Sequence, residues 1–162
     1  MNKLTHISNS GHVKMVDVTE KPASLRSARA RATVHLGRQT LAQVLDFKVA
    51  KGNVLETARI AGIMAAKRTG DLIPMCHPLN ITHAQVDFAP EPQTGRIVVT
   101  ANVRLSGPTG VEMEALTAVS VACLTIYDMC KVLDKSIRIT DMMLLEKAGG
   151  KSGHYRHPEA GR

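Results

Sequence analysis

One segment of the sequence limits the possible folds more than any other. It is a long apolar run that begins after the GPTG stretch at 107–110 and continues to Lys131. Apolar residues recur in it at three- and four-residue spacing, which predicts a helix with a buried stripe along about twenty residues. Thr109 followed by Glu112 is typical of a capping box at the helix start. Few lysines or glutamates coat the other faces, so we expect the helix to be buried on most sides.

The same helix carries charged residues of both signs. On a helical projection Glu114 and Asp128 lie within roughly 40° of each other, about four turns apart, and Lys131 follows Asp128 one turn later. We therefore expect these side chains to line one wall of a site. The alternative is a solvated ion pair between Asp128 and Lys131, which would contribute only a few tenths of a kcal/mol.

The rest of the sequence predicts alternating strands and helices. Asn53 and Glu56 form a second capping pair, at the start of a helix. Period-two alternation predicts strands at 28–36, 81–88, 96–105 and 136–145, and helical patterns cover 39–48 and 54–68, before the long helix. The order β-α-β-β-α-β is the split βαβ or ferredoxin-like plan, an α+β fold with helices packed on one face of an antiparallel sheet. We expect a single domain over 1–162, with 1–14 and 154–162 flexible.

Charge and composition narrow the class of partner. A net charge of +7 favours an anionic partner, which could be nucleic acid, a membrane surface or a phosphorylated metabolite. Two Phe, two Tyr and no Trp leave little on which bases could stack, which argues against nucleic acid. No run of eighteen apolar residues or signal-like start is present, and three cysteines suggest no disulfide framework, so we expect a cytoplasmic protein without membrane contact. A phosphorylated metabolite fits best.

Two short motifs are candidate sites. Cys76 and His77 lie in a proline-flanked loop, but adjacent ligands do not easily reach one ion, so we expect no bound metal and assign His77 to hydrogen bonding or proton transfer. The GKS sequence at 150–152 resembles the end of a Walker A loop, but Leu145 stands where that motif needs a glycine. We reject a P-loop, although this segment could still wrap a phosphate, and a disordered basic tail is the alternative.

Four lysines form the last group of candidate residues. Each one alone is most often a solvated surface charge. Together, lysines beside carboxylates could bind a triphosphate and supply acid/base groups. They are Lys51, Lys67, Lys131 and Lys147.

Three segments of the sequence carry a family resemblance. Residues 51–79, 109–131 and 147–153 closely resemble the cyclic pyranopterin monophosphate synthase family, the molybdenum cofactor biosynthesis protein C, and MVDVTEK near residue 15 fits that family too. Many relatives have leucine at the position of Met75. The resemblance implies a lyase that converts cyclised dihydro-GTP (3',8-cyclo-7,8-dihydroguanosine 5'-triphosphate) to cyclic pyranopterin monophosphate and releases pyrophosphate. It also implies a hexamer built as a trimer of dimers, with each pocket between two subunits.

The resemblance also assigns roles to residues. Asp128 would be the principal acid/base, helped by Lys131 and Lys51. No cofactor would be required, although Mg²⁺ could assist with the triphosphate. The base and ribose would be held by Met75, Cys76, His77, Glu112, Met113 and Glu114. Independently of the resemblance, a leaving pyrophosphate needs positive charge where negative charge develops, which Lys67, Lys147 and Arg26 could supply.

Two other functions remain open from the residues. A ferredoxin-like binding module would hold GTP-like ligands without chemistry, although such a module gains nothing from three carboxylates. An RNA-binding oligomer could use the basic strand that carries Arg29 and Arg31, and a steep salt dependence of RNA affinity would support it.

Overall fold

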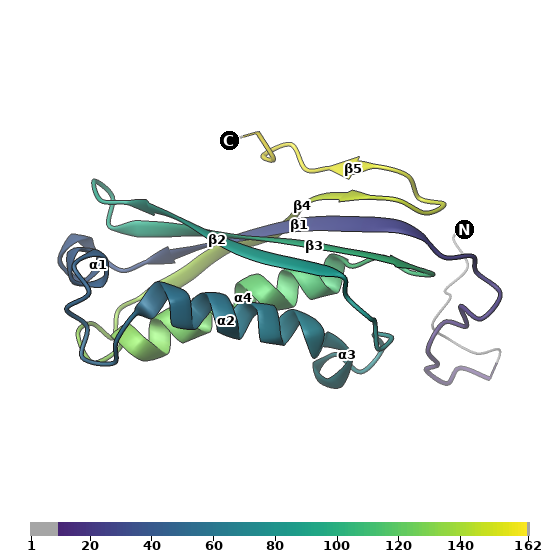
Figure 1. Cartoon of the computed structure of the whole chain (residues 1–162), viewed down its shortest axis with the longest axis horizontal. Helices are drawn as coiled ribbons and strands as arrows, with labels where there is room; N and C mark the ends of the chain where they lie inside the picture. Colours follow the sequence, from purple (N-terminus) through teal and green to yellow (C-terminus); the bar gives the residue numbers. More distant parts are fainter. Residues whose placement is uncertain (1–9, 162) are drawn as a thin grey trace.

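The helices and strands follow the predicted order, with a short helix and a short fifth strand added. The structure is a computed structural model that describes residues 10–161. A twisted sheet lies on one side of the molecule and the two long helices cover one of its faces (Figure 1). The elements are β1 (Ser24–His35), α1 (Arg38–Leu45), α2 (Val54–Lys67), α3 (Thr69–Leu72), β2 (His83–Glu91), β3 (Arg96–Gly107), α4 (Glu112–Cys130), β4 (Arg138–Ala148) and β5 (Tyr155–Arg156).

The sheet confirms the ferredoxin-like α+β fold. Its strand order is β2-β3-β1-β4-β5, and every neighbouring pair is antiparallel. β1 therefore lies in the middle, between β3 and β4. The chain reaches β3 through a hairpin from β2, and it reaches β4 through a helical crossover. Two irregularities interrupt the β1–β4 pairing, between Arg29 and Ala30 and between Arg31 and Thr33. Bulges of this kind usually bend a strand, and the far end of β4 carries the site residue Lys147.

Small side chains let the helices lie close to the sheet. Ala30 and Ala32 of β1 and Ala101 of β3 are fully buried under α4, while the residues between them face the open side of the sheet. In the helix layer, Gly62 of α2 lies against Ala118 of α4. α4 is long and apolar enough to cross a membrane by length and composition, but 56% of that apolar window is buried inside this core.

The start of α4 differs from the prediction. Val111, not Thr109, is the N-cap residue, and no side chain caps the helix there. The predicted capping box is wrong because the Glu112 carboxylate is engaged elsewhere, at 2.8 Å from the Lys147 ammonium. Asn53 does cap α2, by accepting a hydrogen bond from the Glu56 N–H.

Other boundaries shift as well. β1 begins four residues before the predicted start, at Ser24, and β4 runs to Ala148, so both strands extend to the candidate site. The segment expected to be a flexible tail contains β5, which pairs with β4 through Tyr155 and Arg156. Most of the N-terminal segment expected to be flexible, residues 1–9, lies outside the described residues.

Candidate active site

The candidate residues form two clusters, one at each end of α4. Glu112 and Glu114 lie in its first turn, whereas Asp128 lies in its last. At 1.5 Å per residue, Glu114 and Asp128 are about 21 Å apart along the helix axis. Glu114 is also buried, with 3% of its surface exposed, while the Asp128 side chain is 56% exposed. The expectation that both line one wall is therefore wrong within a single chain.

A lysine–aspartate cluster occupies the C-terminal end of α4. The Lys51 ammonium donates to the Asp128 carboxylate and to its backbone carbonyl, both at 2.8 Å, and the Lys131 ammonium lies 2.7 Å from the other carboxylate oxygen. Lys51 precedes α2, so the antiparallel packing of α2 on α4 brings it here. The predicted ion pair of Asp128 and Lys131 exists and is joined by a lysine 77 positions away in the sequence.

These contacts shift the pKa values of Asp128 and Lys131 in the lysine–aspartate cluster. Hydrogen bonds from Lys131 and Lys51, together with their positive charges, lower the pKa of Asp128 to about 2. The carboxylate is thus ionised at neutral pH and is a weak base while both lysines remain in place. Hydrogen bonding to Asp128 also raises the pKa of Lys131. Each ammonium keeps at least one N–H free of these contacts for a ligand.

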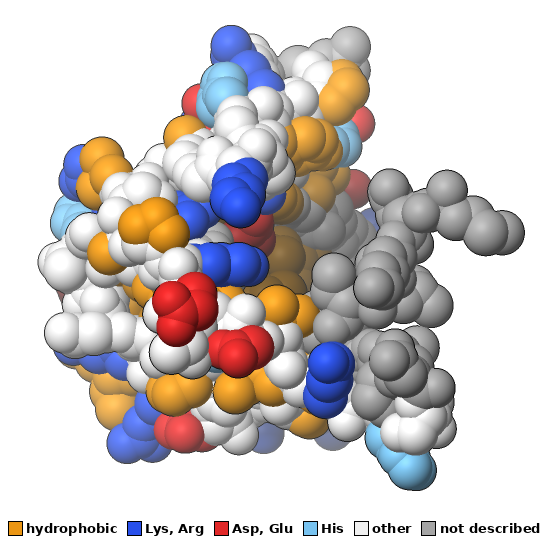
Figure 2. Space-filling model, turned by 90° about the vertical axis from the view of Figure 1, so that its right-hand side faces the viewer, with side chains coloured by type: hydrophobic (Ala, Val, Ile, Leu, Met, Phe, Trp, Pro, Cys, Tyr) orange, Lys and Arg blue, Asp and Glu red, His pale blue; other side chains and the backbone are white. Residues whose placement is uncertain are grey.

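Two adjoining cavities occupy the N-terminal end of α4. The larger has a volume of about 680 Å³ and the smaller about 320 Å³, and both are lined by Lys21, Thr109, Gly110 and Glu112. Figure 2 views the molecule from this end, where basic and acidic side chains border a hollow. The four shared lining residues place the two cavities next to each other.

The larger cavity is basic. Arg26 of β1 donates to the carbonyls of Gly107 and Pro108, each at 3.3 Å, which fixes its guanidinium beside the cavity. Lys147 of β4 bonds to Glu112 and, at 2.9 Å, to the Ser152 hydroxyl. Lys21 and Lys151 complete a set of four cations around this space. Such a set matches a ligand with several negative charges.

Two glycines make the wall of the larger cavity possible. Gly149 and Gly150 both have positive φ, 100° and 74°, which L side chains rarely adopt. A side chain at Gly149 would also collide with the Leu25 carbonyl, and one at Gly150 with the Arg26 guanidinium. The loop can therefore wrap closely around Arg26 only with glycine at both positions.

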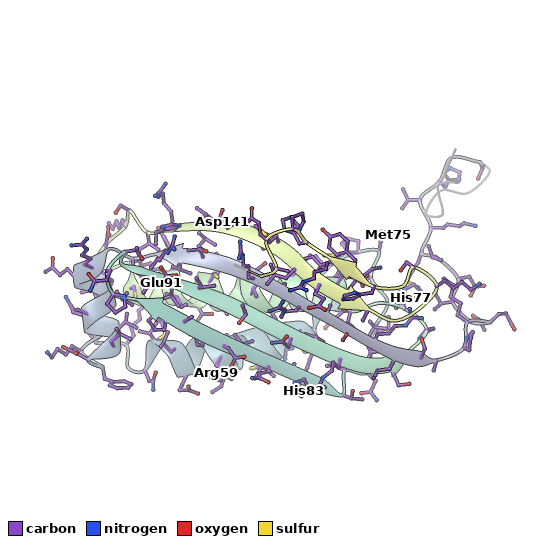
Figure 3. All side chains as sticks on the ribbon, turned by 90° about the horizontal axis from the view of Figure 1, so that it is seen from above. Arg59, Met75, His77, His83, Glu91 and Asp141 are labelled. Carbon is purple, nitrogen blue, oxygen red and sulfur yellow. The ribbon has the colours of Figure 1, made fainter. Side chains whose placement is uncertain are left out.

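The smaller cavity contains a buried acid. Met75, Cys76 and His77 line it from the proline-flanked loop, opposite Met113 and Glu114 of α4. Met75 and His77 lie at the end of the sheet remote from Glu91 (Figure 3). Burial raises the pKa of Glu114 to about 7, with a further contribution from the charge of Glu112. Burial and the charge of Glu114 raise the pKa of the Cys76 thiol, so Cys76 is a neutral contact.

His77 has a structural partner in the N-terminal segment. Its Nε2–H donates to the Val16 carbonyl at 2.8 Å, because a carbonyl can only accept. The bond ties segment 16–21 to the smaller cavity, where Val16, Val18 and Lys21 form one side.

Most of the predicted site residues are therefore gathered, in two groups. Lys51, Asp128 and Lys131 form one, and Arg26, Met75, Cys76, His77, Glu112, Met113, Glu114 and Lys147 line the paired cavities. Lys67 is exposed at the end of α2 and is not part of the lining of either cavity. Lys21 was missed. Its only signal was its place at the end of the MVDVTEK segment, seven residues before the start of a predicted strand.

Comparisons with known proteins agree on one family. The sequence model of the MoaC family matches residues 15–150. A protein of Desulforapulum autotrophicum named cyclic pyranopterin monophosphate synthase is 56% identical, with 98% of this chain and 100% of that protein covered. A protein of the same name from Chloroflexus aurantiacus is 54% identical, with 97% and 96% covered. One from Desulfatibacillum aliphaticivorans is 56% identical, with 96% and 98% covered.

Proposed function

The chain belongs to the MoaC family, and we infer that it forms cyclic pyranopterin monophosphate from cyclised dihydro-GTP and releases pyrophosphate. This makes it a lyase of molybdenum cofactor biosynthesis. The observation that supports this function most directly is the pair of adjoining cavities, one basic and one with a buried acid. Their chemistry matches a nucleotide with a polyphosphate at one end and a purine-derived ring at the other.

The basic cavity is the proposed triphosphate site. Arg26 supplies a planar guanidinium for phosphate oxygens, and Lys147 and Lys21 supply point charges. Charge on the departing pyrophosphate grows as the cyclic phosphate closes, so fixed cations there stabilise the transition state. Lys67 lies outside this lining, and we propose that it acts on the phosphates bound by a neighbouring subunit.

The smaller cavity is the proposed site of the base and ribose. Glu112 and Glu114 offer carboxyl oxygens to the N–H donors of a guanine-derived ring, and Met113 and Met75 offer apolar contact. With a pKa near 7, Glu114 can accept or donate a proton at neutral pH. His77 and Cys76 shape the rim from the loop.

The lysine–aspartate cluster is the proposed acid/base centre. Lys51 and Lys131 hold protons for transfer to the opening ring, and Asp128 orients them and balances their charge. Its pKa of about 2 makes Asp128 a poor base in the free protein. When a ligand draws one lysine away, the pKa of Asp128 rises and it becomes the acid/base that the family resemblance assigns.

The distance between the two clusters favours a site shared by two subunits. About 21 Å of helix separates Glu114 from Asp128, which is more than one nucleotide base and ribose can span. We propose that the cavities of one protomer face the lysine–aspartate cluster of another, in a hexamer built as a trimer of dimers. Exposed apolar side chains on the helix layer, Ile60, Met64 and Leu124, provide surface for such contacts.

No protein-bound cofactor is part of this proposal. Among residues 10–161, no three His, Cys, Asp or Glu side chains are grouped as ligands for an ion. We propose that any assisting Mg²⁺ enters with the triphosphate oxygens, as this ion commonly does. The protein is proposed to work in the cytoplasm on this small molecule, without nucleic acid or membrane.

The alternatives have less support. The RNA-binding hypothesis needs free arginines on β1, but Arg29 lies 3.4 Å from Glu146 and Arg31 lies 2.5 Å from Glu159. A binding module without chemistry would have no use for the lysine–aspartate cluster, which lies at the opposite end of α4 from the two cavities.

Turnover is the test of the proposed function. Purified protein is mixed with cyclised dihydro-GTP, and cyclic pyranopterin monophosphate and pyrophosphate are followed by liquid chromatography and mass spectrometry. Equimolar appearance of both supports the synthase. Unchanged substrate that remains bound to a folded oligomer would instead support the binding module.

Lysine variants test the proposed acid/base centre. Lys51→Ala and Lys131→Ala should keep the fold and lower turnover by about 10²- to 10⁴-fold, the usual contribution of acid/base groups. Lys48→Ala is the matched control, because Lys48 is an exposed lysine that also pairs with an aspartate, Asp46. Full turnover in both Lys51→Ala and Lys131→Ala would remove the lysines from the mechanism.

A further inference from the structure

The loop that forms the wall of the basic cavity has both of its ends in the sheet. Lys147, which precedes the loop, pairs with Tyr155 of β5, and Glu146 pairs with Arg156. The residues between these pairs include Gly149, Gly150 and Gly153, all with positive φ. Three glycines give the loop backbone wide freedom. Its position therefore depends on how firmly β5 is held.

The residues on both sides of β5 are attached to β4 and β1 of the sheet. The His157 N–H donates to the Leu145 carbonyl at 2.8 Å, and His154 lies 2.7 Å from the Glu146 carboxylate. Arg29 of β1 donates to the Ala160 carbonyl at 3.3 Å. In Figure 1 the segment runs beside β4 on the side of the sheet opposite the helices.

The shortest of these attachments joins Arg31 and Glu159. The Arg31 guanidinium lies 2.5 Å from the Glu159 carboxylate and also donates to the Glu159 backbone carbonyl at 3.5 Å. The Arg31 side chain is only 14% exposed, and it belongs to β1, the central strand of the sheet. A guanidinium held in this way is a rigid anchor for the otherwise short β5.

We propose that segment 154–160 is a brace for the 149–153 loop and that Glu159, through Arg31, is a positioning residue for Lys147 and the phosphate-binding wall. The segment contributes little to the core, since Tyr155 and Arg156 are exposed and no residue of 154–160 is among the buried hydrophobic side chains. Its loss therefore acts on the loop more than on the fold. For its kinetic readout this proposal rests on the proposed function.

The brace predicts a specific kinetic pattern. A loosened loop must be ordered when the triphosphate binds, which costs binding free energy. The lysine–aspartate cluster lies at the other end of α4 and is untouched. Breaking the anchor should raise KM for the cyclised substrate by about 5- to 10-fold, and leave kcat within about twofold, because ordering is a binding cost.

Three full-length variants test the proposal. Glu159→Lys places a cation against Arg31, and Arg31→Glu combined with Glu159→Arg restores the pair in the reverse sense. Asp87→Lys is the matched control, because Asp87 is an ion-paired carboxylate of the edge strand β2 with an exposure of 45%, against 44% for Glu159. Hydrogen exchange of the 149–153 amides is measured beside KM and kcat.

Each outcome decides the proposal. Faster exchange at 149–153 in Glu159→Lys, with unchanged exchange in α4 and with protection regained in the reversed pair, supports the brace. Unchanged loop exchange, an equal effect of Asp87→Lys, or failure of the reversed pair to restore protection would overturn it. A fall in kcat at constant KM would also overturn it. If the wild-type protein turned over no substrate, the proposed function would fail, while the exchange data would still decide the brace.

Discussion

At the scale of single residues, surroundings give two carboxylates on one helix opposite properties. Asp128 lies between two ammonium groups, and its pKa falls to about 2. Glu114 is buried beside Glu112, and its pKa rises to about 7. The residue type alone would assign both the same role. Their neighbours make one a fixed anion and the other a group that titrates near neutral pH.

The raised pKa of Glu114 predicts a pH dependence of stability. Its folded pKa of about 7 lies above the ordinary value of 4.5, so the folded state binds this proton more tightly than the unfolded state does. The free energy of unfolding should therefore fall as pH rises from 4.5 to 7, by about 3 kcal/mol, and stay level above that range.

Urea unfolding of the wild-type protein and of Glu114→Gln at pH 5 and pH 8 checks this expectation. The free energy of unfolding of the wild type should be lower at pH 8 than at pH 5. Most of this decrease should be absent in Glu114→Gln. An equal loss in both proteins would show that Glu114 does not carry the raised pKa.

At the scale of elements, the close contact of α2 and α4 brings Lys51 to Asp128. Gly62 allows that contact: a β-carbon there would lie 2.9 Å from the Ala118 carbonyl and 3.0 Å from Val86. Gly62→Val should therefore lower the free energy of unfolding by about 1–3 kcal/mol, the usual cost of overpacking. Met64→Val is the control, because Met64 lies on the exposed side of the same helix.

Denaturant midpoints of both variants measure that difference. The control reports the cost of a β-branched residue in α2 without crowding. A midpoint for Gly62→Val equal to that of Met64→Val would contradict the view that the α2–α4 contact depends on glycine at this position.

The elements also show which structural features the sequence could predict. Period-two alternation located β1 and β3 because one face of each packs on helices and the other faces away. The same pattern could not reveal β5, since Tyr155 and Arg156 are exposed and are held by backbone pairing and by Glu159. The Thr109–Glu112 capping pair failed because Lys147, distant in the sequence, competes for the Glu112 carboxylate.

The candidate site, like the fold, could be predicted only in part from the sequence. Residue types and the family resemblance predicted Lys51, Asp128 and Lys131, and the structure brings all three together. Helical periodicity also suggested that Glu114 and Asp128 share a wall. It gives only their angular positions around the helix, and the two residues are about 21 Å apart along the helix axis. Lys21 stayed hidden because its segment has no periodic pattern, only a turn closed by its N–H on the Val18 carbonyl.

At the scale of the whole molecule, one chain contains every proposed group but does not assemble them into one site. Its cavities and its lysine–aspartate cluster lie at opposite ends of α4. The proposed oligomer resolves this by pairing the cavities of one protomer with the cluster of another. Two variants that each damage a different end should then complement each other in a mixed oligomer.

Complementation in mixed oligomers is the measurement that tests this central claim most directly. Lys51→Ala and Lys147→Ala chains are co-expressed with different tags, and oligomers that carry both tags are isolated and assayed. Random assembly should restore about a quarter of the wild-type sites, because each intact site takes one undamaged end from each chain. The control is Lys51→Ala with Lys131→Ala, which damages the same cluster in both chains and should restore none. Activity no higher than that of the two parent variants would contradict a site shared between protomers.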